Sequence, residues 1–277
     1  IILWLLVFEG ALRKWALPAI SKPLLFVKDP IVLAVYYLAF RHGFFPENSI
    51  LLRSGAFLAV LFIALGVVQC IGLDLPPLVA LYGWRQYWML MPLPFIIAET
   101  FNGKDLLRFT KHMMIMSSIN AVLCILQSRA PADSWINCAT PDGRVVTYGD
   151  GDTTLTRSTG SFSFSFGHQL LAGALVPLGI ALWLMPPKQR HMPLRLLIFY
   201  TIMILINVIL DGNRGVFILS AYPLVFSISG FWLLKNRKLR RRALLLPIVA
   251  CLIGGALYAV AFSSAFQAMS NRVTTSE

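Results

Sequence analysis

Long apolar stretches, separated by short polar turns, run along most of this chain. Several approach the roughly 20 residues that a helix needs to cross about 30 Å of hydrocarbon. Strand-like alternation of apolar and polar positions is absent, which disfavours a transmembrane barrel. We therefore predict an all-α fold, a polytopic transmembrane bundle of about eight helices. The predicted spans cover residues 30–45, 50–73, 78–101, 108–128, 162–185, 194–211, 213–234 and 243–262.

Both ends of the chain lie next to apolar segments. Ile1–Phe8 is too short to cross a bilayer, so we interpret it as the stub of a longer helix. No cleavage-site pattern follows it, which disfavours a processed signal peptide. Asn271–Glu277 comes directly after an apolar segment. We expect residues 1–277 to form a single transmembrane domain that is truncated at both ends.

Composition supports a bilayer as the solvent. Hydrophobic residues make up 57% of the chain and charged residues 13%, far from the balance of a water-soluble domain. The formal net charge is +12, which we assign to topology signals and to attraction by anionic lipid. Membrane lipid is therefore an expected partner, and nucleic acid is not.

Basic residues in short loops predict the orientation, because such loops stay in the cytoplasm. Lys235–Arg242 carries six cations and Lys188–Arg195 carries three more, so both are expected inside. Counting spans from them places the turn Asp211–Gly215 and the loop 129–161 outside. Upstream the count depends on the short apolar run at 30–45. If that run spans, Arg13, Lys14, Lys22 and Lys28 lie outside, and otherwise they lie inside; we favour spanning, because Asp29-Pro30 is a common helix start.

After the first predicted span, the cations left outside are all arginines, whose planar fork can grip a phosphate with two parallel hydrogen bonds. Arg214 lies at the expected mouth of an inward-running helix, where unpaired N–H groups would add to an anion site. Its alternative role is to pair with Asp211 or to snorkel to lipid headgroups. Arg85 stands among aromatic residues and is either a site residue or an interfacial anchor. The external set is Arg85, Arg129, Arg144, Arg157, Arg214 and Arg272.

The stretch Arg157–His168 loads hydroxyls, a cation and an imidazole onto the outer end of an inward-running helix. Such a segment is suited to a sugar and a phosphate together. In the alternative, the serines bond to their own helix backbone, the phenylalanines face lipid, and His168 is a packed residue rather than a base or ligand. No metal or cofactor is expected, because the four histidines are scattered and nucleotide-binding motifs and paired cysteine motifs are absent.

Two stretches, Phe8–Pro18 and Asp211–Gly215, resemble O-antigen ligases and O-antigen or exopolysaccharide polymerases, which are glycosyltransferases of the bacterial inner membrane. The second is similar to the Ser-Arg-Gly turn of that family, with Asn213 in place of Ser. The resemblance implies a multi-pass, GT-C-like bundle. It also implies metal-independent, inverting transfer of a glycan from an undecaprenyl-diphosphate carrier to a glycan or lipid acceptor at the periplasmic face.

Under this resemblance, Arg214, Arg157, Arg85 and Arg272 would hold the diphosphate and stabilise charge on the leaving group. His168 and Arg13 are further candidates. The family has an important histidine in a large periplasmic loop beyond residue 277, so we expect the catalytic base to lie outside this chain and residues 1–277 alone to be inactive.

A polysaccharide or lipid transporter or flippase is the competing interpretation, and a membrane scaffold without chemistry is a third. Transport would require polar groups lining a central cavity. Apart from Asp211 at the very end of one span, Glu99 is the only acidic side chain inside a predicted span, and Gln69, Asn120 and Asn207 are neutral. Glycan transfer is therefore the preferred hypothesis.

Overall fold

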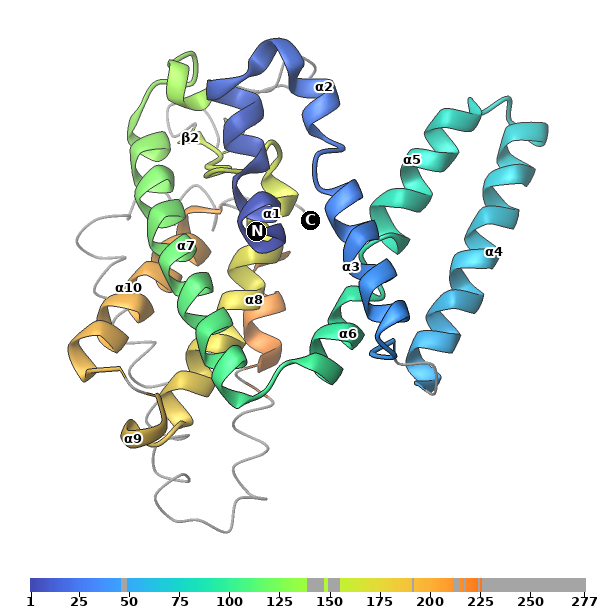
Figure 1. The fold of residues 1–277 in the computed structure, drawn as a ribbon. Helices are drawn as coiled ribbons and strands as arrows, with labels where there is room; N and C mark the ends of the chain where they lie inside the picture. Colours follow the sequence, from blue (N-terminus) through green and yellow to red (C-terminus); the bar gives the residue numbers. More distant parts are fainter. Residues whose placement is uncertain are drawn as a thin grey trace. The chain divides into compact units, whose positions relative to one another are not determined.

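The computed structural model describes residues 1–45, 49–138, 147–148, 155–190, 192–211, 215–216, 218–223 and 225. The chain divides into two compact units (Figure 1). Unit 1 contains Leu3–Leu25 together with the described residues from Leu107 onward, and unit 2 contains Phe26–Leu106.

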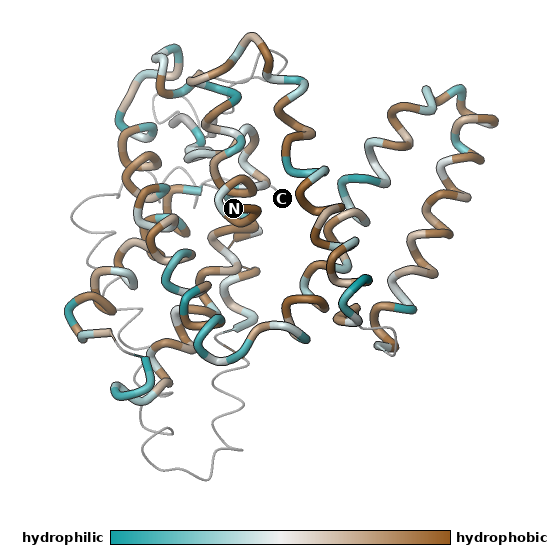
Figure 2. The backbone as a smooth tube through the Cα atoms, in the orientation of Figure 1, coloured by the Kyte–Doolittle hydropathy of each residue, from teal (hydrophilic) through white to brown (hydrophobic). Residues whose placement is uncertain are grey.

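Unit 2 consists of four helices: α3 (Asp29–Arg41), α4 (Ile50–Gly72), α5 (Pro77–Trp88) and α6 (Leu93–Thr100). The first begins at Asp29 with Pro30 in its first turn, as the sequence predicted. The second packs along α5 and exposes large apolar side chains over most of its length. Figure 2 shows α4 as an almost continuous hydrophobic helix. Such a surface is suited to lipid.

The single helix expected at 78–101 is instead two helices, α5 and α6, joined by a turn. Pro92 lies at this break, immediately before α6, and Pro94 lies in the first turn of α6. Proline has no backbone N–H and its ring clashes with the preceding turn, so a helix interior tolerates it poorly. Apolar length alone predicted one span here, and the prolines divide it.

Unit 1 is built from an N-terminal helix, three longer helices and short connecting elements. A π-helical turn follows the N-terminal helix, and two short strands pair antiparallel with Thr147 opposite Thr156. Its elements are α1 (Ile2–Ala11), η1 (Leu12–Ala16), η2 (Pro18–Ile20), α2 (Ser21–Leu24), α7 (Gly103–Arg129), η3 (Trp135–Asn137), β1 (Thr147–Tyr148), β2 (Leu155–Thr156), α8 (Ser165–Leu184), α9 (Pro187–Arg190) and α10 (Leu194–Leu210).

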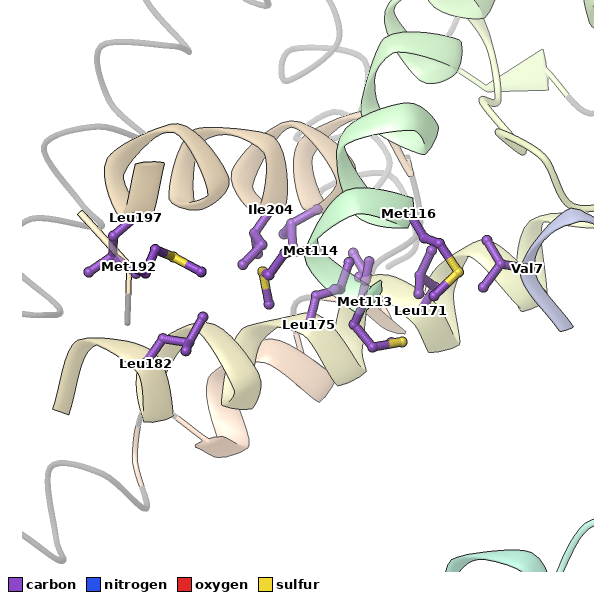
Figure 3. Packing of buried hydrophobic residues seen from close by; sticks show 13 residues of the cluster. Val7, Met113, Met114, Met116, Leu171, Leu175, Leu182, Met192, Leu197 and Ile204 are labelled. Carbon is purple, nitrogen blue, oxygen red and sulfur yellow. The ribbon is translucent and has the colours of Figure 1, made fainter. Parts of the chain in front are cut away.

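The core of unit 1 lies where α1, α7, α8 and α10 meet (Figure 3). Methionines of α7 interdigitate with leucines of α8 and with Ile204 of α10, and Val7 brings α1 into the same cluster. Met114, Met116 and Leu175 are fully buried. Because methionine is flexible, it can fill irregular space between packed helices.

Within the described residues, four helical stretches are long and apolar enough to cross a membrane: Pro18–Arg41, Ile50–Gly72, Gly103–Arg129 and Ser165–Leu184. They indicate a membrane protein. Helix α10 is apolar but shorter. The predicted span 243–262, and most of the predicted span 213–234, lie outside the described residues.

Candidate functional site

Three stretches that the sequence singled out meet in unit 1. Segment 157–165, here called the hydroxyl segment, lies against the N-terminal helix. Gly10 permits this contact, because a Cβ there would collide with the backbone of residues 161–163. Ser161 also donates a hydrogen bond of 2.6 Å from its Oγ to the carbonyl of Val7. The N-terminal motif is therefore a docking surface for the hydroxyl segment.

Arg13 anchors one end of this contact. Its Nη1 donates to Ser163 Oγ at 3.1 Å, and its Nε donates to the carbonyl of Ser21 at 2.9 Å. Glu9, one helical turn earlier, lies 3.8 Å from the guanidinium and offsets its charge. Arg13 is buried within the π-helical turn η1, where the helix widens by one residue per turn.

Lys14 anchors the other end. Its Nζ donates to Thr159 Oγ1 and to the carbonyl of Gly160, both at 2.9 Å, and lies 4.6 Å from the ring centroid of Trp15. Only 5% of the side chain is exposed. Burial lowers the pKa of Lys14 from 10.5 to about 8, and the nearby Cys138 and Cys124 thiols offset part of that shift. Lys14 remains mostly cationic at neutral pH.

The free energy of unfolding is expected to rise with pH between about 8 and 10.5, because the native chain releases the Lys14 proton in that window while the unfolded chain still holds it. The rise should reach roughly 3 kcal/mol, since one pKa unit corresponds to about 1.4 kcal/mol. Lys14→Met, which cannot titrate, should lack it. Denaturant unfolding of both proteins at pH 7, 9 and 10.5 would measure the difference, and parallel pH profiles would contradict the assignment.

Arg157 is the third cation of the site. It is half-buried, and its Nη1 donates to Ser165 Oγ at 3.5 Å. Arg13 and Lys14 thus bond to hydroxyls of the hydroxyl segment, and Arg157 bonds to a hydroxyl of its own segment. Ser158, Ser161 and Ser163 bond to other elements rather than to their own helix backbone, and Phe164 and Phe166 are exposed.

Two buried side-chain amides of α7, those of Gln127 and Asn120, hold the hydroxyl segment in place. Gln127 Oε1 accepts from the backbone N–H groups of Thr159 and Gly160, and its Nε2 donates to the carbonyl of Gly160 at 3.1 Å. Asn120 Oδ1 accepts from the Ser161 amide at 2.8 Å. Gly160 has φ +55°, and a Cβ there would strike Asn120, so glycine is required on both counts.

His168 lies fully buried behind the same segment. Its Nδ1 is 3.1 Å from Asp211 Oδ1 and 3.2 Å from the carbonyl of Ser158, and its Nε2 is 3.1 Å from Asn207 Oδ1. Asp211 and Asn207 are themselves fully buried. His168 therefore connects the hydroxyl segment to Asp211, the first residue of the motif that the sequence singled out at 211–215.

The remaining predicted site residues are distributed differently. Arg85 lies in unit 2, where its Nε and Nη2 donate to the carboxylate of Asp29 at 2.5 and 2.7 Å and its guanidinium covers Phe26. The carboxylate of Asp29 therefore occupies the fork with which Arg85 would grip a phosphate. Arg214 and Arg272 lie outside the described residues.

Sequence reasoning missed several members of the site. Lys14 stands inside the motif that carried the resemblance, but its partners are about 145 residues away in sequence. Gln127 carries no charge and belongs to no motif. Asn120 and Asn207 were noted only as neutral residues in predicted spans, although their side chains bond to each other at 2.8 Å. Polar residues inside apolar helices were the usable signal.

The arrangement brings cations, hydroxyls and backbone groups together in a partly exposed segment. Buried polar side chains of α7, α8 and α10 lie next to that segment. This chemistry fits an anionic ligand that also carries hydroxyl groups. Comparison of the chain with protein-family models, with curated proteins and with solved structures found no match.

Proposed function

We propose that this protein transfers a glycan from an undecaprenyl-diphosphate carrier at the periplasmic face of a bacterial inner membrane, as an O-antigen ligase or a polysaccharide polymerase does. One observation carries the proposal: Arg13 and Lys14 bond to the hydroxyl segment, and Arg157, which lies in that segment, bonds to its Ser165. The resemblance of Phe8–Pro18 to that family concerns the same place, because this motif supplies two of the three cations.

A diphosphate is a suitable ligand for such a cluster. Gathering like charges is unfavourable unless a counter-charge offsets their repulsion. The carboxylate of Glu9 offsets part of the positive charge. The charge remaining on the cluster would attract phosphate oxygens and would stabilise negative charge as it grows on the departing diphosphate. Lys14 and Arg13 are buried and bonded to protein partners, so they act on the diphosphate mainly through their electrostatic field and not by direct contact. Arg157 is half-buried and is the cation best placed for direct contact.

Arg214 and Arg272 remain sequence-based candidates for the same diphosphate, and Arg214 follows closely after Asp211, which contacts His168. Arg85 is a weaker candidate, because Asp29 engages its guanidinium. A base must still remove the acceptor proton. His168 is fully buried and therefore serves this proposal as a supporting residue.

Arg157→Ala should weaken binding of undecaprenyl diphosphate by roughly tenfold or more, because a hydrogen bond to a charged group contributes about 1.5–3 kcal/mol. Arg108→Ala makes the same charge change at an exposed position near the other end of α7 and should leave the affinity within about twofold. Titration of the protein in nanodiscs with undecaprenyl diphosphate would measure both. Equal affinities for the two variants would remove Arg157 from the site.

Transport of a polysaccharide or lipid is the second candidate function, because Asn120, His168 and Asn207 place polar groups inside α7, α8 and α10. These side chains bond to one another, which suits a structural layer better than a substrate path. Uptake of a lipid-linked glycan by proteoliposomes without any glycosidic bond formation would favour transport over transfer.

A further inference from the structure

Trp135 is unusually exposed for a tryptophan in a structured turn. It opens the short helix η3, and 74% of its surface is accessible. The two residues that follow it, Ile136 and Asn137, are buried. The ring therefore projects from a turn whose other side chains pack inward, rather than from a fully solvated loop.

The turn beneath Trp135 is firmly held. Asn137 Nδ2 donates to the carbonyls of Gln127, Ala130 and Pro131, at 3.1, 3.1 and 2.9 Å, and so caps the end of α7. Gln127 Nε2 in turn donates to the carbonyl of Ile136 at 3.2 Å. Gln127 is the same side chain that holds the hydroxyl segment, so Trp135 and that segment share one support.

Trp15 connects Trp135 to Lys14. The two indole rings meet edge to face, with centroids 6.3 Å apart and an interplanar angle of 70°, and Trp15 Nε1 donates to the carbonyl of Trp135 at 3.2 Å. Trp15 also carries Lys14 Nζ 4.6 Å from its ring centroid. One ring thus separates the exposed indole from a cation of the proposed diphosphate site.

We infer that Trp135 is the stacking platform for the sugar ring attached to the lipid diphosphate, with Trp15 holding it in position. The inference rests on the proposed function. A sugar joined directly to a diphosphate must lie beside the group that binds the phosphates. The C–H faces of a sugar ring are apolar and pack on the electron-rich face of an indole, while its hydroxyls remain in water.

Tryptophan is also common at the membrane interface, where its ring lies among lipid headgroups. An anchoring role and a sugar subsite make different predictions. If Trp135 is an anchor, its removal has the same effect on lipid binding whether or not the lipid diphosphate carries a sugar. A subsite contributes only when the sugar is present, so the two lipids separate the roles.

The test compares undecaprenyl diphosphate with undecaprenyl-diphosphate-N-acetylglucosamine, titrated into the full chain in nanodiscs. The wild-type protein should bind the sugar-bearing lipid about five- to tenfold more tightly, the increment expected of one aromatic contact. Trp135→Ala should abolish this increment while leaving the affinity for the bare lipid unchanged, and Trp135→Phe should keep most of it. Trp4→Ala, which removes a less exposed indole of α1, is the matched control.

Each outcome bears on one proposal or on both. If the bare lipid binds and Trp135→Ala does not change the gain in affinity that the sugar gives, the sugar subsite is overturned and the proposed function stands. The same holds if Trp135→Ala lowers the affinity for both lipids equally. Binding of neither lipid by the wild-type protein overturns the proposed function, and the subsite with it. Unchanged melting temperatures of the tryptophan variants confirm that folding does not cause the difference.

Discussion

Gly10→Ala is expected to lower the free energy of unfolding by about 3 kcal/mol or more. The new Cβ would lie 2.5 Å from the Ser161 carbonyl oxygen and 2.6 Å from the Phe162 carbonyl carbon, and it would collide with the Ser163 amide nitrogen. These atoms are all backbone, so α1 or the hydroxyl segment must shift as a whole. That shift would also weaken the bonds of Arg13 and Lys14 to the same segment.

Gly72→Ala is the control for this substitution, because a Cβ at Gly72 meets nothing within 4 Å. It should be neutral or slightly stabilising, since alanine is the better helix former. Tryptophan fluorescence during denaturant unfolding, with both variants in the same detergent, would measure the two effects. If Gly10→Ala unfolded at the same denaturant concentration as Gly72→Ala, the close contact between α1 and residues 161–163 would be wrong.

The existence of the long helices could be predicted, and their continuity could not. Helices α4, α7 and α8 follow from apolar length, which decides whether a segment can leave water. Hydropathy does not register that Pro92 and Pro94 remove backbone donors, so the window covering 78–101 predicted one helix where there are two. The start of α3 at Asp29 was predictable, because Asp-Pro acts locally.

The candidate site was predictable in its parts but not in its assembly. Phe8–Pro18 and Arg157–His168 were each recognised, yet no local pattern shows that Gly10 accepts the backbone of residues 161–163. Such a contact depends on how three helices pack. Charge was also an incomplete guide. It favoured Arg85, whose guanidinium is paired with Asp29. It gave no weight to the uncharged Gln127, whose side chain makes four of the hydrogen bonds that hold the segments together.

His168→Ala should produce the other large loss, about 3 kcal/mol or more of the free energy of unfolding. The imidazole is fully buried and stands 3.1 Å from Asp211 Oδ1, and its removal would leave that buried carboxylate without this partner. The Ser158 carbonyl and Asn207 Oδ1 would lose contacts as well. His168→Gln keeps an amide that can donate to part of this set, so it should recover a portion of the loss. Thermal unfolding in nanodiscs would rank the variants.

A second substitution, at Asp211, tests whether His168 stabilises the fold by interacting with the Asp211 carboxylate or only by filling space. Asp211→Asn removes the buried charge, so the double variant should be more stable than His168→Ala alone, by about 1 kcal/mol. If His168→Ala cost the same in both backgrounds, the two side chains would not interact and His168 would be a packing residue. A measured coupling would mean that one buried pair holds Asp211 to the histidine that also contacts the hydroxyl segment through the carbonyl of Ser158.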